Sequence, residues 1–80
     1  MKQEYIVNLN DINNLRQFTT DVLYKIESHV DAIYERQTVD AKSLLGLASL
    51  SSHDIRVVIN SDDKKELETF RKICERYEVK

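Results

Sequence analysis

Tyr5, Val7 and Leu9 alternate with other residues near the start of the chain and fall on one face of an extended segment. A period of two residues is typical of a half-buried strand, so we predict a strand over residues 4–9. The polar residues that follow, from Asn8 to Asn14, predict a turn.

A helical period replaces the alternation from about Asn14 to Ser28. Apolar residues recur there every three or four positions, which is the stripe of an amphipathic helix. Asn13 or Asn14 is the expected N-cap, because asparagine side chains accept hydrogen bonds from the first free amides of a helix. The predicted buried stripe is Leu15, Phe18, Val22 and Ile26.

Alternation returns from Val30 to Gln37, with Val30, Ala32 and Tyr34 on one face. A brief strand over Thr38–Asp40 is expected to pair with this segment. A short, very apolar helix is then predicted to begin at Ser43.

The last part of the chain predicts one more strand and one more helix. Residues 55–60 are rich in β-branched side chains, and Ser61, Asp62 and Asp63 form a signal for a helix start. Strands and helices interleaved in this order favour an α+β two-layer domain, with a sheet covered by helices on one face. The final helix is expected to bury Leu67, Phe70, Ile73, Cys74 and Tyr77.

Length and composition limit the possible functions. With 80 residues, the chain is predicted to form a single domain over residues 1–80. Its 12 Lys and Arg against 14 Asp and Glu give a net charge of −2 without a basic stripe, so we expect no nucleic-acid partner. The sequence has no long apolar run of the kind that forms a signal peptide or a membrane span. Cys74 is the only cysteine, which fits a reducing compartment. We therefore expect a cytoplasmic protein without membrane contact.

The most distinctive motif is the run from Lys42 to Leu50, Lys-Ser-Leu-Leu-Gly-Leu-Ala-Ser-Leu. Its Ser43 stands at the predicted start of the short helix, where a serine cap contributes about 1 kcal/mol. A helix start also stabilises a phosphate, so Ser43 is a candidate for regulatory phosphorylation as well as a cap.

This run resembles the serine-site signature of the HPr phosphocarrier family, K-S-[IL]-[ML]-G-[LV]-x-S-L. The resemblance implies one fold across nearly all 80 residues, an open-faced β-sandwich of βαββαβα order, with a four-stranded antiparallel sheet and helices on one face. It also implies that Ser43 is the target of an HPr-type serine kinase.

The second signature of the family, G-[LI]-H-[AS]-R-P, is altered in this chain. Aligning the family arginine with Arg16 places Ile12 at the glycine, Asn14 at the phosphorylated histidine and Gln17 at the proline. An asparagine amide is not a useful nucleophile toward a phosphoryl donor, so no catalytic residue is expected here. Arg16 remains as a candidate anion-binding residue.

The two histidines are poor replacements for the missing one. His29 falls at the end of the first predicted helix, where the helix dipole favours cations over phosphate. His53 lies in a polar loop and lacks a neighbouring basic residue. His29, His53 and Cys74 show no short ligand spacing, so no metal site and no cofactor are expected.

Leucines give the short helix more apolar surface than one buried stripe needs. Leu47 and Leu50 are expected in the core. Leu44 and Leu45 match the exposed contact positions of the family, so we predict that they bind a partner protein together with Ala48, a smaller side chain than is common at that position.

These features predict an HPr-like regulatory or adaptor protein of the sugar phosphotransferase system rather than an enzyme. The resemblance is to the catabolite-repression HPr homologue, in which the histidine is also replaced. The expected partners are an HPr-type serine kinase/phosphatase or a transcriptional regulator of catabolite repression. Two alternatives stay open: a phosphocarrier with another acceptor residue, and a structural module without phosphorylation.

Overall fold

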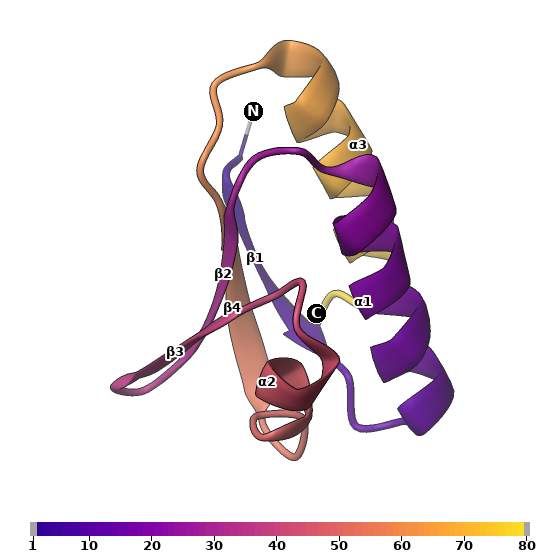
Figure 1. Cartoon of the computed structure of the whole chain (residues 1–80), viewed down its shortest axis with the longest axis vertical. Coiled ribbons are helices and arrows are strands. Elements are labelled where there is room, and N and C mark those ends of the chain that lie inside the picture. The colour runs from indigo at the N-terminus through magenta and orange to yellow at the C-terminus, as the bar shows by residue number, and fades with distance from the viewer. Residues whose placement is uncertain (1, 80) are drawn as a thin grey trace.

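The computed structural model describes residues 2–79 and shows two layers, a sheet and a layer of helices (Figure 1). The element order is strand, helix, strand, strand, helix, strand, helix, which confirms the predicted fold class. The elements are β1 (Glu4–Asn8), α1 (Ile12–Lys25), β2 (Val30–Tyr34), β3 (Gln37–Asp40), α2 (Leu44–Ala48), β4 (Asp54–Ile59) and α3 (Lys64–Glu75).

The sheet is antiparallel throughout, in the strand order β1-β4-β2-β3. The register places Tyr5 opposite Val57 and Val57 opposite Ala32, so these buried side chains form one row beneath the helices. The other face is open, and an ion pair between Arg56 and Glu4 crosses it at 2.9 Å.

Helices α1 and α3 lie side by side over the sheet, whereas α2 lies at one end, near α1 and β3 (Figure 1). The predicted apolar stripes meet in the core between the layers, and the burial predicted for Cys74, Leu47 and Leu50 is confirmed. The aromatic rings pack edge to face, Tyr5 with Phe70 and Phe18 with Tyr77.

The first helix differs from the prediction at both ends. Asp11, not Asn13 or Asn14, is its N-cap: the Asp11 carboxylate accepts hydrogen bonds from the backbone N–H groups of Asn13 at 2.8 Å and Asn14 at 3.1 Å. The helix ends at Lys25 instead of Ser28, because Ile26 takes an extended conformation. His29 therefore lies beyond the helix, just before β2.

The hairpin between β2 and β3 turns earlier than predicted. Strand β2 ends at Tyr34, and Glu35 and Arg36 form the turn. Glu35 has φ of 53°, a left-handed conformation that L-residues other than glycine adopt at a cost of about 1–2 kcal/mol. This strained turn projects from the end of the molecule that also carries α2 (Figure 1).

Candidate functional site

Helix α2 presents the serine motif as the sequence predicts. Ser43 is its N-cap, and the Ser43 hydroxyl accepts a hydrogen bond from the N–H of Gly46 at 3.1 Å. Leu47 is fully buried, while Leu44 is 41% exposed and Leu45 is 85% exposed. The helix thus anchors one side in the core and leaves two leucines in solvent.

Gly46 lets the cap sit close to strand β3. A Cβ atom added to Gly46 would lie 3.3 Å from the Ser43 hydroxyl oxygen and 3.3 Å from the Cβ of Val39, tighter than ordinary van der Waals contact. Because Val39 is held in a strand, it has little freedom to move aside. The glycine of the motif therefore leaves room for the Ser43 cap to pack this close to β3.

A shallow cavity of about 440 Å³ lies between α1 and α2. Polar and apolar side chains of α1 line it together with Lys42 and Leu44, and its two basic residues are Arg16 and Lys42. We use the name α1–α2 surface for the cavity residues together with the exposed residues of α2 beside it: Arg16, Thr19, Thr20, Leu23, Tyr24, Lys42, Leu44, Leu45 and Ala48.

Leu23 and Tyr24 belong to this surface although they are not among the residues predicted from the sequence. Leu23 is 47% exposed and Tyr24 is 80% exposed. A signal was available, since both apolar residues fall outside the buried stripe of the same helix. The structure thus extends the apolar surface that Leu44 and Leu45 predict from α2 onto α1.

The start of α1 brings Arg16 to this surface but not Asn14. The N–H of Asn14 is already used by the Asp11 carboxylate, and Asn14 lies inside the first turn of the helix. The carboxylate places negative charge where a bound anion would otherwise meet free amides. The anion-binding role of Arg16 stays a prediction, and it depends on the guanidinium of Arg16 alone.

The remaining candidate residues lie apart from one another. His29 contacts Asp31 at 2.6 Å, and His53 stacks on Tyr34 with ring centroids 3.9 Å apart and planes 5° apart. Cys74 is fully buried, and this burial raises the pKa of its thiol. Within residues 2–79, no group of three or more His, Cys, Asp and Glu side chains is placed to hold a metal ion.

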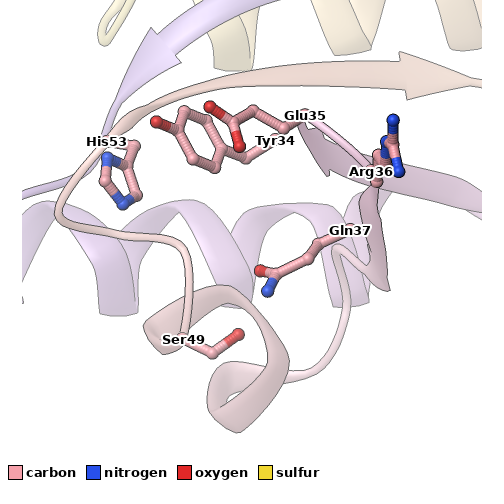
Figure 2. Close-up of a pocket in the computed structure, with 6 residues that line it drawn as sticks. All are labelled: Tyr34, Glu35, Arg36, Gln37, Ser49 and His53. Carbon is pink, nitrogen blue, oxygen red and sulfur yellow. The ribbon is translucent and has the colours of Figure 1, made fainter.

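Tyr34 and His53 belong to a second pocket, which is not predicted from the sequence. Its volume is about 540 Å³, and its lining comes from the β2–β3 turn, the end of α2 and the loop before β4 (Figure 2). We call it the turn pocket, lined by Tyr34, Glu35, Arg36, Gln37, Ser49 and His53. These segments are adjacent only in the folded chain, so local sequence patterns gave no signal for it.

Comparison of the chain with protein-family models, with curated proteins and with solved structures gives no match. The HPr family therefore remains a resemblance of motif and fold. Over residues 2–79, no helix is both long and apolar enough to cross a membrane.

Proposed function

We propose that this domain is an HPr-like regulatory or adaptor module of the sugar phosphotransferase system, which binds a partner protein through the α1–α2 surface. The observation that carries the proposal is the exposure of Leu45, at 85%, on a helix whose Leu47 is fully buried. Leu45 lies on the same surface as the exposed Leu23, Tyr24 and Leu44, and a contiguous exposed apolar patch is typical of a contact site.

The basic residues of the α1–α2 surface indicate the chemistry of the partner. Arg16 and Lys42 line the same cavity as Leu23, Tyr24 and Leu44. An apolar centre beside two cations fits a partner surface with an apolar centre and acidic residues at its rim. Complementary charges at a rim mainly increase the association rate and exclude wrong partners.

Phosphorylation of Ser43 is the proposed regulation. A phosphate adds a charge of about −1.5 to −2 at neutral pH. It would stand between Lys42 and Leu44 in the chain, beside the cations of the α1–α2 surface. Modification is therefore expected to change which partner binds while leaving the fold intact.

The first experiment uses an HPr-type serine kinase with ATP, followed by mapping of the modified residue. The proposal expects one phosphate on Ser43 and none in Ser43→Ala. Absence of phosphate, or phosphate on Ser49 or Ser51 instead, contradicts the proposed regulation.

A matched pair of variants tests the proposed surface with the same kinase. Leu44 and Ile6 are each 41% exposed, but Ile6 lies on β1, away from the α1–α2 surface. Leu44→Glu is expected to slow phosphorylation by at least about tenfold, equivalent to about 1.4 kcal/mol of lost contact, while Ile6→Glu changes it by less than about twofold. Equal rates in the two variants would remove the α1–α2 surface from the proposal.

A further inference from the structure

The turn pocket has the size of a small-molecule site. Its volume of about 540 Å³ exceeds that of the cavity on the α1–α2 surface, about 440 Å³. Clefts that bind small molecules span about 300–1,000 Å³ and carry a few polar groups that fix the orientation of the ligand. The question is which chemistry its lining residues recognise.

Two opposite charges in the pocket are left without protein partners. Glu35 and Arg36 are neighbours in the turn, yet neither forms an ion pair with any residue in the range 2–79. Elsewhere on the surface some exposed opposite charges meet, as Arg56 and Glu4 do at 2.9 Å, while others, such as Glu27 and Lys64, also lack an ion pair among residues 2–79. The carboxylate of Glu35 and the guanidinium of Arg36 are therefore both available to a ligand.

These two charges occupy different ends of the pocket. Figure 2 shows the Glu35 carboxylate extending along Tyr34 in the direction of His53, while the Arg36 guanidinium lies at the opposite end. Gln37 and Ser49 line the pocket from the side of α2 (Figure 2). The Ser49 hydroxyl donates to the carbonyl of Gly46 at 2.6 Å, so its oxygen remains free to accept a hydrogen bond.

We propose that the turn pocket binds a small linear zwitterion, with a primary ammonium group at the Glu35 end and a carboxylate at the Arg36 end. An ammonium group donates three hydrogen bonds, and the Glu35 end offers the two carboxylate oxygens and the Tyr34 hydroxyl as acceptors. The planar guanidinium of Arg36 matches a carboxylate with two parallel hydrogen bonds. The pocket lies outside the α1–α2 surface, so this inference does not depend on Ser43 or on the proposed partner.

The test is an NMR titration of the intact, nitrogen-labelled protein with γ-aminobutyrate at near-neutral pH. We expect saturable shifts of the backbone amides of Tyr34, Glu35, Arg36, Gln37 and His53. Butylamine and butyrate each lack one of the two charges, and each is expected to bind up to about fivefold more weakly, because an exposed ion pair contributes up to about 1 kcal/mol.

Charge-matched variants then distinguish the pocket from general electrostatics. Glu35→Gln and Arg36→Gln are each expected to weaken binding of γ-aminobutyrate by about fivefold. Glu27→Gln and Lys64→Gln change the net charge by the same amounts at exposed positions elsewhere and are expected to change binding by less than about twofold. Non-saturable shifts, equal binding of a singly charged analogue, or equal loss in a control variant would each overturn the inference.

Discussion

The two ends of the molecule treat their polar groups differently. Where α1 and α3 pack together, the Glu66 carboxylate accepts hydrogen bonds from the N–H groups of Glu27 at 2.8 Å and Ser28 at 3.1 Å, and from the Ser28 hydroxyl. At the other end, beside α2 and the β2–β3 turn, Glu35 and Arg36 have no ion-pair partner in the described chain.

In the α1–α3 region, the buried carboxylate of Asp21 also has charged partners. Asp21 is 6% exposed, and its carboxylate accepts from Gln17 at 2.9 Å and lies 3.6 Å from the ammonium of Lys25 and 3.8 Å from the guanidinium of Arg76. The α1–α3 region thus holds the carboxylates of Glu66 and Asp21 with hydrogen bonds and ion pairs, while the β2–β3 turn leaves Glu35 and Arg36 without an ion pair among residues 2–79. Removing a carboxylate should therefore lower stability at Glu66, and at Glu35 it should weaken the proposed binding of a zwitterion.

The largest expected effect is on the core. Phe70→Ala removes a fully buried ring that packs against Tyr5 and should lower the free energy of unfolding by about 3–5 kcal/mol. Leu45→Ala, at an 85% exposed position of the α2 end, should change it by less than about 0.5 kcal/mol. Urea unfolding measures both. Similar losses in the two variants would mean that the two regions do not differ as described.

Glu66 gives the next largest effect, and it depends on pH. Hydrogen bonds from Ser28 lower the pKa of Glu66 to about 2 from its ordinary value of 4.5, against the opposing effect of burial. Folding thus favours the ionised form of Glu66. The contribution of this carboxylate to the free energy of unfolding is complete above pH 4.5 and is lost as the pH falls toward 2. Because Glu66 is partly exposed, we expect a contribution of about 1–2 kcal/mol.

Glu66→Gln should therefore lower stability at neutral pH and flatten its decline in acid. Unfolding monitored by circular dichroism across this pH range checks both expectations. Glu35→Gln is the control from the other region, since the Glu35 carboxylate has no ion pair to lose among residues 2–79. If the stability of Glu66→Gln declined in acid as that of the wild type does, the Glu66 carboxylate would not stabilise the segment between α1 and β2.

The beginning of α1 predicts a smaller effect. Asp11→Ala removes the acceptor of two backbone hydrogen bonds and should cost about 1 kcal/mol, whereas Asn14→Ala should cost less than about 0.5 kcal/mol. Thermal or urea unfolding distinguishes the two variants. A larger loss of stability in Asn14→Ala than in Asp11→Ala would mean that Asn14 is the N-cap. The first amides of α1 would then be free to bind an anion.

The sequence predicts best what depends on periodicity. Alternation places Tyr5, Val7 and Leu9 on the buried side of the sheet, and the helical stripes place Phe18 and Phe70 in the core. Ser43 is recognised as a cap because it alone precedes a strongly apolar helix. That all four strands are antiparallel follows from the resemblance to HPr, whereas the residue pattern alone leaves an antiparallel or a mixed sheet open.

The parts that the sequence does not predict depend on competing local choices or on distant contacts. Asn10, Asp11, Asn13 and Asn14 all have good capping side chains, and only the folded backbone selects Asp11. The bond between Ser28 and Glu66 joins residues 38 positions apart. The turn pocket likewise needs the β2–β3 turn to meet His53, a contact that no short motif encodes.

The smallest expected effect is a gain in stability at the α2 end. Glu35 holds φ of 53°, where glycine avoids a steric cost of about 1–2 kcal/mol but loses about 0.5–1 kcal/mol more through backbone entropy. Glu35→Gly should therefore stabilise the fold by about 0.5–1 kcal/mol while removing the carboxylate that the proposed zwitterion needs. Arg36→Gly, at a position without positive φ, should instead lose about 0.5–1 kcal/mol. Urea unfolding and titration with γ-aminobutyrate measure the two properties in the same variants. If Glu35→Gly is more stable but binds γ-aminobutyrate more weakly, Glu35 contributes to binding and not to the stability of the fold. If this variant binds as well as the wild type, the pocket does not use the Glu35 carboxylate.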